Sequence, residues 1–212
     1  TINSYLSTPT LLSGRDQGAI SEAAIRLSQT SVLTYRSTAV SSFFDMYGPG
    51  LALNFPGFAY TDKGSLITQF PLTYTSFIAG FYSLFGITGL TLANSLLLFC
   101  FLLTLFELLR LFIRPERAFI ATLVGALSFL PLYFVQFTLT ENLAVFLFTF
   151  LVYSLIRFIQ KPVFLHYVAI ALTAALLTFT RIEGYAFLVL TGVVLLWNKD
   201  ARTMFRTYPW KS

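Results

Sequence analysis

The chain has 212 residues, of which 56% are hydrophobic and only 11% are charged, and its mean hydropathy is +0.74. Soluble domains are about half apolar and about a quarter charged, so this composition predicts an integral membrane protein. The net charge of +5 does not indicate a nucleic-acid partner, because basic residues at the ends of membrane spans commonly serve only to orient them. The single cysteine, Cys100, excludes an intramolecular disulfide and a metal site built on thiolates.

The chain begins at Thr1, with neither a methionine nor the apolar core of a signal peptide, and we therefore expect it to be part of a longer protein. The first predicted element is an amphipathic helix that starts just after Asp16 and Gly18 and lies near the membrane face. Its apolar face carries residues at helical spacing: Ile20, Ala23, Ala24 and Leu27. Asp16 has a structural explanation as a helix cap, and Glu22 is better explained by an i,i+4 ion pair with Arg26.

Residues 43–64 are rich in glycine, proline and aromatic side chains, which predicts an ordered loop on a membrane surface. Residues 66–86 follow, with a polar first half broken by Pro71 and an apolar stretch of only about eleven residues from Phe77. That length favours an interfacial or re-entrant helix over a complete span. On this interpretation the N-terminal segment is extracytoplasmic.

Five apolar runs approach the ~20 residues that cross a bilayer as a helix. They cover residues 88–112, 117–136, 142–160, 163–180 and 184–198. The fold class predicted is therefore all-α, a polytopic bundle of transmembrane helices with an extracytoplasmic loop that carries juxtamembrane helices. Its domains would be the first loop (1–87), the five-span bundle (88–198) and a cytoplasmic segment (199–212). Glu107 inside the first span is expected to pair with Arg110.

Basic residues separate the two sides of this bundle. Nine fall on one side, in the loops and the tail: Arg110, Arg114, Arg117, Arg157, Lys161, Lys199, Arg202, Arg206 and Lys211. The loops around Glu141 and Glu183 carry only Arg181. The positive-inside rule makes the first side cytoplasmic and places these three residues on the extracytoplasmic side.

Motifs of soluble enzymes are missing from the sequence, which has no P-loop, dinucleotide fingerprint, GxSxG or HExxH. His166, the only histidine, lies near the start of a predicted span and is better explained as structural. The candidate residues for chemistry are charged side chains expected on one face: Asp16, Asp45, Asp62, Lys63, Glu141, Arg181 and Glu183. Carboxylates there could act as general bases, and the cations could hold a phosphate.

Each of these residues also has a structural explanation. Asp62 could hold a turn before Gly64, and Glu141 could be a favourable charge at a helix N-terminus. Arg181 and Glu183 could pair with each other at the end of a span. Asp16 and Glu141 are the strongest of the functional candidates, because charge at a membrane is commonly functional.

The order of these features resembles the GT-C superfamily of membrane glycosyltransferases, in particular the bacterial branch related to protein O-mannosyltransferases and the lipid A aminoarabinose transferase. The similar features are an acid opening a juxtamembrane helix in "GRDQGAISEAAIRL", a Gly-rich aromatic loop, and a proline-containing segment that ends in "LFG". The proline-bearing "ALSFLPLYFVQF", the acid in "TEN" and the turn from Arg181 to Gly184 complete the order. The resemblance covers residues 16–197 and depends on the order of its motifs.

The resemblance implies an inverting transfer of a sugar from a polyprenyl-phosphate donor to a hydroxyl or amine of a lipid, glycan or protein acceptor, on the extracytoplasmic face of the plasma (inner) membrane. The resemblance implies that Asp16 is the catalytic base and that Glu141 shapes the site or binds a metal. The cofactor is unknown from the sequence, and a divalent cation is one option. Lys63 and Arg181 would neutralise the leaving phosphate, with Asp62 and Glu183 beside them in the substrate site. Relatives often carry a lysine just before the segment's proline, whereas this chain has Gln69-Phe70-Pro71.

The alternative from another functional class is a transporter or flippase of lipid-linked glycans. A transporter places polar residues or broken helices near the middle of the membrane. Here the interiors of the predicted spans are almost free of charge, and the polar groups gather at one surface. This distribution favours the enzyme. A non-catalytic scaffold would leave the one-sided acids without an explanation.

Overall fold

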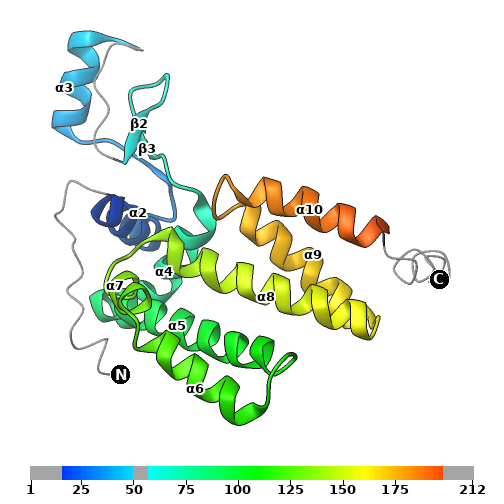
Figure 1. Ribbon diagram of the computed structural model, residues 1–212. Helices are drawn as coiled ribbons and strands as arrows, with labels where there is room; N and C mark the ends of the chain where they lie inside the picture. Colours follow the sequence, from blue (N-terminus) through cyan, green and yellow to red (C-terminus); the bar gives the residue numbers. More distant parts are fainter. Residues whose placement is uncertain (1–15, 50–56, 198–212) are drawn as a thin grey trace. The chain divides into compact units, whose positions relative to one another are not determined.

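The computed structural model describes residues 16–49 and 57–197, which are mostly helical (Figure 1). The helices of this part of the chain are α2 (Asp16–Thr30), α3 (Thr38–Tyr47), α4 (Leu72–Phe85), α5 (Ile87–Leu109), α6 (Pro115–Ala126), α7 (Phe129–Phe134), α8 (Thr140–Gln160), α9 (Phe164–Thr178) and α10 (Gly184–Trp197). The strands are β1 (Thr34–Tyr35), β2 (Phe58–Tyr60) and β3 (Leu66–Thr68).

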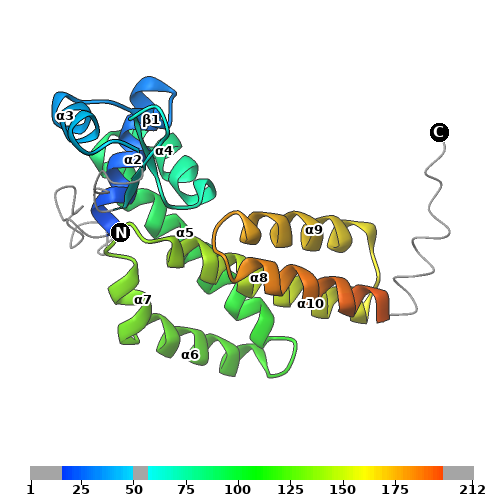
Figure 2. The same cartoon turned by 90° about the horizontal axis from the view of Figure 1, so that it is seen from above.

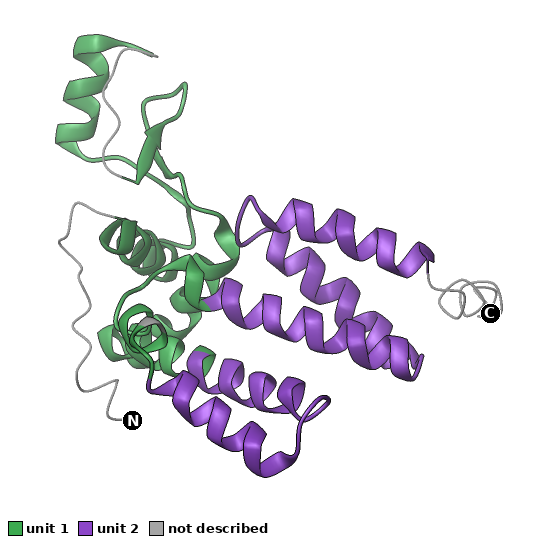
Figure 3. Cartoon of the chain, in the orientation of Figure 1, with its two compact units in different colours: residues 1–97, 128–142 green, residues 98–127, 143–212 purple. Residues whose placement is uncertain are grey.

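The chain divides into two compact units (Figure 3). Unit 1 comprises residues 1–97 and 128–142, and unit 2 comprises residues 98–127 and 143–212. Unit 1 thus joins the polar N-terminal part to the first turns of α5, to α7 and to the start of α8. The predicted domain boundary at residue 87 remains a prediction, and the predicted cytoplasmic segment 199–212 lies outside the described residues.

The sequence predicted no strands, and the expectation of an all-α chain is wrong in this respect. Unit 1 contains a small antiparallel sheet with the strand order β1-β3-β2. In its register Thr34 pairs with Ile67, and Ala59 pairs with the same residue from the other side. The strands are two or three residues long, which is too short for an alternating apolar pattern to show in the sequence.

The sheet packs against α2 and α3 around a small apolar core. The buried members of that core are Ala19, Ala23, Val40, Phe58 and Leu66, with Tyr35, Tyr60 and Phe70 packed against them. The predicted amphipathic helix is confirmed as α2, whose buried face includes Ile20 and Ala24. The helix begins at Asp16 itself, so that this acid lies in the first turn.

Two glycines allow this core to close. Gly57 has a φ of +77°, and a Cβ atom there would lie 2.2 Å from the Cβ of Ala19. Gly64 has a φ of +73°, and a Cβ atom there would lie 2.6 Å from the ring of Phe44. Only glycine adopts the left-handed region at little cost, and it alone leaves room for these neighbours. The β2–β3 turn therefore packs tightly on α3.

Residues 66–86, predicted as one interfacial or re-entrant segment, form two elements. They contain β3 and then α4, which begins directly after Pro71 and packs against α2. Proline is well tolerated at a helix start because it has no N–H group to leave unpaired. A turn at Gly86, which has a φ of +59°, separates α4 from α5.

Among the described residues, α5 and α8 are long and apolar enough to cross a membrane. Their most apolar windows have mean hydropathies of 2.1 and 1.9, and only 22% and 33% of those windows are buried inside the protein. The core helix of a soluble protein would be mostly buried. Helices α9 and α10 are apolar but shorter.

The predicted span over residues 117–136 is replaced by two shorter helices, α6 and α7. The break falls at Leu127 and Ser128, and Ser128 has the extended backbone of a helix N-cap. Pro131 explains the break between the two helices, because the proline ring would clash with the carbonyl of Leu127 in a continuous helix. In α7 the same proline occupies the first turn, where its missing N–H group costs nothing.

In unit 2, α9 and α10 run antiparallel and side by side (Figures 1 and 2). The tight turn between them depends on Gly184, where a Cβ atom would lie 2.3 Å from the carbonyl oxygen of Leu177. Large apolar side chains on these two helices are exposed: Leu172, Leu176, Leu188, Val189, Leu190, Val193, Leu196 and Trp197. Water does not favour such a surface.

Candidate functional site

The N-terminal turn of α2 is hydrogen-bonded to the segment that leads into α8. The hydroxyl of Thr138 donates to the carbonyl oxygen of Gln17 over 2.8 Å and lies 2.5 Å from the hydroxyl oxygen of Ser21. The Ser21 hydroxyl donates to the same carbonyl, also over 2.8 Å. Thr138 and Ser21 are both buried. Two parts of the chain more than a hundred residues apart are thus joined by polar contacts shielded from water.

On its other side the same segment is held by Asn94 of α5. The Asn94 side-chain amide donates to the carbonyl oxygens of Val135 and Phe137 over 3.3 and 2.8 Å. Its carbonyl oxygen accepts a 2.6 Å hydrogen bond from the hydroxyl of Tyr74. Because backbone carbonyls only accept hydrogen bonds, these partners fix the orientation of the amide. Tyr74 is fully buried and Asn94 almost so.

Asn142 completes the network from the first turn of α8. Its amide donates to the carbonyl oxygens of Phe134 and Phe137 over 3.0 and 2.9 Å. Phe137 therefore accepts from two asparagines, Asn94 and Asn142. The short connection between α7 and α8 is held in one conformation by these side chains together with turn hydrogen bonds from the N–H groups of Phe137 and Leu139 to the carbonyls of Phe134 and Phe137.

Glu141 lies next to this network at the start of α8. Burial raises the pKa of Tyr74 strongly; hydrogen bonding with the side chains of Asn142 and Asn94 opposes that rise, and the negative charge of Glu141 adds to it. Tyr74 is therefore a neutral hydrogen-bond donor. Glu141 is adjacent in sequence to Asn142, which belongs to this network. The Glu141 side chain is half-buried and accepts a 3.3 Å hydrogen bond from the Thr140 hydroxyl.

Asp16 and Glu141, the two strongest sequence candidates, both belong to unit 1 and both lie in the first turn of a helix. Asp16 is exposed and is adjacent in sequence to Gln17, whose carbonyl accepts from Thr138. Glu141 follows Thr138 by three residues. The segments that carry the two acids are therefore directly bonded to each other. Each acid also interacts favourably with the positive end of its own helix.

Asp62 and Lys63 lie at the exposed tip of the β2–β3 hairpin. The turn is closed by a hydrogen bond from the Gly64 N–H to the carbonyl of Thr61, at 3.0 Å. The turn predicted before Gly64 is present, and a role of the Asp62 side chain in holding it stays a prediction. The Arg36 side chain donates to the backbone carbonyl of Lys63 and to the hydroxyl of Ser65. The hydrogen bonds from Arg36 thus hold the hairpin tip that carries the Lys63 ammonium group in unit 1.

Arg181 and Glu183 belong to unit 2 and form an ion pair in the turn between α9 and α10. The Arg181 Nε and a Glu183 carboxylate oxygen are 3.1 Å apart. Hydrogen bonding to Arg181 lowers the pKa of Glu183. The structural explanation proposed for this pair is confirmed, so a phosphate bound by Arg181 would have to share its guanidinium with a carboxylate.

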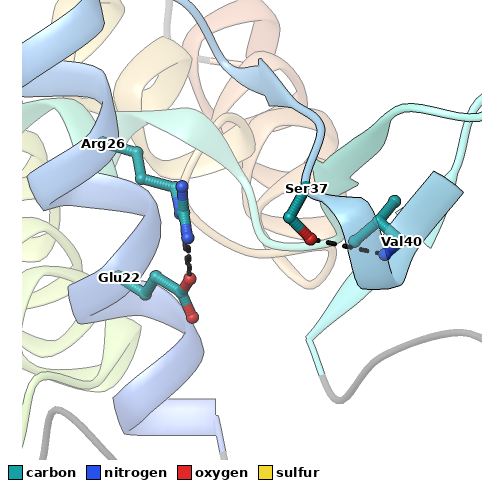
Figure 4. Close-up of polar contacts among 4 residues, drawn as sticks. All are labelled: Glu22, Arg26, Ser37 and Val40. Carbon is teal, nitrogen blue, oxygen red and sulfur yellow. Dashed lines mark hydrogen bonds and ion pairs between the residues drawn. The ribbon is translucent and has the colours of Figure 1, made fainter.

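Other charged residues have the structural roles expected of them. Glu22 and Arg26 form the predicted i,i+4 pair at 2.6 Å (Figure 4). The Arg26 guanidinium also stacks over the ring of Tyr35, 3.7 Å from its centroid. Glu107 and Arg110 pair at 2.7 Å, as predicted.

Asp45 and His166 lie on the helices α3 and α9. Asp45 is exposed on α3, whose N-terminus is capped by the hydroxyl of Ser37 accepting from the Val40 N–H (Figure 4). His166 lies in the first turn of α9 with its Nδ1 atom 3.3 Å from the carbonyl of Lys161. Neither residue has a contact that points to chemistry.

Sequence analysis missed the polar residues that hold the connection leading into α8: Thr138, Asn142, Asn94 and Tyr74. Asn94 offered one signal, since an amide inside a predicted apolar span needs hydrogen-bond partners in the folded protein. The other three gave none, because threonine, asparagine and tyrosine are ordinary residues beside loops. Among residues 16–49 and 57–197, no group of three or more His, Cys, Asp or Glu side chains could hold a metal ion.

No protein-family model matches the chain, and neither a curated protein nor a solved structure is detectably similar to it.

Proposed function

We propose that the chain is part of an integral membrane glycosyltransferase of the GT-C type, which transfers a sugar from a polyprenyl-phosphate donor to an acceptor hydroxyl or amine on the extracytoplasmic face of the plasma membrane. The observation that carries the proposal is the bonded contact between the segments of Asp16 and Glu141 in unit 1. Such a site needs a general base, which one of these two acids at the starts of α2 and α8 would supply.

The membrane part of the proposal is a polytopic bundle in which the predicted spans are supplied by α5, by α6 with α7, and by α8, α9 and α10. Its support is the apolar length of α5 and α8 and the exposed apolar side chains on the remaining helices. On α6 these side chains are Phe119, Ile120, Leu123 and Val124. Contact of such surfaces with lipid would cost no free energy, whereas their contact with water would be unfavourable.

In the proposed reaction Asp16 takes the proton from the acceptor as its oxygen or nitrogen attacks the anomeric carbon. The bond from that carbon to the lipid phosphate breaks, its electron pair leaves with the phosphate, and the sugar configuration inverts. Asp16 is suited to this role because it is exposed, and the described chain gives it no ion-pair partner. Glu141 would orient the acceptor or a bound cation from its half-buried position.

Negative charge develops on the leaving phosphate, and a cation placed there would lower the barrier. Lys63 is the better candidate of the two predicted, because it projects from a braced hairpin tip in the same unit as Asp16. Arg181 is already paired with Glu183 and would act only by exchanging partners. The carboxylates of Asp62 and Glu183 would then partly offset the positive charge of their neighbours, Lys63 and Arg181.

The test is to incubate the full-length protein in membranes or detergent with a panel of polyprenyl-phosphate sugars and cell-envelope acceptors, and to measure the release of lipid phosphate. Release that depends on acceptor supports the transferase. Movement of labelled lipid-linked sugar across vesicles without release would overturn it in favour of a flippase. The absence of release with every donor would also reject the proposal.

A further inference from the structure

The hydrogen bond from Thr138 to Gln17 joins the segments that carry the two candidate acids. Gln17 is the neighbour of Asp16, and Thr138 precedes Glu141 by three residues. A hydroxyl hydrogen bond tolerates little change in length, so a bond at this place limits how far the two first turns can separate.

We propose that Thr138 is a positioning residue that sets the spacing between Asp16 and Glu141. The inference rests on the proposed function for its catalytic consequence, although the spacing itself is a structural property. Thr138 acts through the backbone of α2 and the start of α8 and does not touch a substrate in this proposal. A misplacement of about 1 Å in a catalytic group costs on the order of a hundredfold in rate, so a loosened spacing would be visible in kcat.

The segment that carries Thr138 is held independently of this bond. Asn94 and Asn142 donate to the carbonyls of Phe134, Val135 and Phe137, and none of these bonds involves Thr138. The Gln17 carbonyl also keeps its bond from Ser21 when the Thr138 hydroxyl is removed. Loss of that hydroxyl therefore leaves the segment folded and no buried acceptor without a partner, so that the link between the two parts is lost selectively.

Two substitutions at Thr138 separate the effect of its hydrogen bond to Gln17 from the effect of its side-chain packing. Thr138→Val keeps the branched shape of the side chain and replaces the hydroxyl with a methyl group, which must also move away from the Ser21 hydroxyl oxygen, 2.5 Å from the Thr138 oxygen. Thr138→Ser keeps the hydroxyl and removes a methyl group. We expect Thr138→Val to lower kcat by about tenfold or more, with the KM for the donor within about twofold of the wild type. Thr138→Ser should restore most of kcat. A merely structural role for Thr138 would instead affect both variants through their stability.

A second measurement reports the spacing without any enzyme assay. Spin labels on cysteines introduced at Gln29 of α2 and Gln136 of the α7–α8 connection, in a Cys100→Ser background, give a distance distribution for the full chain. Thr138→Val should broaden this distribution, and Thr138→Ser should leave it narrow.

The outcomes separate the two proposals. If the wild type transfers no sugar, the proposed function fails and the label distances alone decide the role of Thr138. An unchanged distance distribution in Thr138→Val would overturn the positioning role, as would a wild-type kcat in that variant of an active enzyme. A loss of kcat equal in the valine and serine variants would overturn it as well.

Discussion

The hydroxyl oxygen of Thr138 lies 2.8 Å from the carbonyl oxygen of Gln17, although 121 residues separate them in the chain. This contact brings the polar N-terminal part of the protein to the start of an apolar helix. Together with the 2.5 Å contact between the Thr138 and Ser21 hydroxyls, it joins the two segments that carry the strongest candidate acids, Asp16 and Glu141.

Replacement of Asp16 by asparagine should abolish sugar transfer and leave membrane insertion intact. The substitution removes the base and keeps the size of the side chain, and loss of a general base commonly costs about a hundredfold to ten-thousandfold in rate. Lipid-phosphate release and membrane fractionation measure the two properties. Glu22→Gln is the matched control, because Glu22 is on the same helix but is paired with Arg26. Full activity in Asp16→Asn would eliminate Asp16 as the base.

A cysteine at Ser42 should react with a membrane-impermeant reagent added to intact cells that carry the Cys100→Ser background. Ser42 is exposed on α3, in the part of the chain proposed to be extracytoplasmic. A cysteine at the exposed Lys161 should react only after the membrane is permeabilised, because that residue lies at the proposed cytoplasmic ends of the spans. Reaction at both positions, or the reverse pattern, would require a different topology.

Tyr74 should make the stability of the protein depend on alkaline pH. Burial raises its pKa in the folded state above the usual value of about 10, so the unfolded chain loses this proton first as the pH rises. The stabilising contribution is therefore complete below about pH 10 and declines above it. Tyr74→Phe cannot ionise and should lose less stability than the wild type between about pH 8 and about pH 11. Thermal unfolding followed by circular dichroism measures the difference, and parallel curves would contradict it.

Gly57→Ala should destabilise unit 1. The new Cβ atom would lie 2.2 Å from that of Ala19, and its φ of +77° is unfavourable for alanine by about 1–2 kcal/mol before the clash is counted. Gly80→Ala is the control, because Gly80 lies within α4 with nothing within 4 Å of such an atom. Alanine favours a helix interior over glycine by about 1 kcal/mol, so this variant should be at least as stable as the wild type. Unfolding temperatures measured in detergent compare the two.

The local ion pairs and the amphipathic helix could be predicted because short-range spacing determines them. Glu22 with Arg26 and Glu107 with Arg110 are three or four residues apart on a helix, which brings their side chains together in any helical fold. The face of α2 that carries Ile20 and Ala23 follows from the same periodicity. These features require no knowledge of the rest of the chain.

The small sheet and the network around Asn94 could not be predicted in this way. Strands of two or three residues are defined by their partners, and Ile67 acquires its partners from two separate segments. Asn94 likewise bonds to backbone carbonyls, whose positions depend on the tertiary fold and not on the identity of Val135 or Phe137. Pro131 indicates the break between α6 and α7 in the sequence, but the apolar length of residues 117–136 led to the prediction of one continuous span.

The hydrogen bonds of Asn94 have a consequence for the order of assembly. Asn94 lies in the first third of α5, and the carbonyls that it binds come 41 and 43 residues later in the chain. When α5 first forms, Tyr74 can already donate to the Asn94 side-chain oxygen, but the Asn94 NH2 group has no protein acceptor yet, and an unpaired polar group in an apolar environment costs several kcal/mol. The N-terminal turns of α5 therefore become fully stable only after the connection between α7 and α8 has been synthesised and packed. The site around Glu141 is thus completed late, as a product of long-range assembly and not of any one helix.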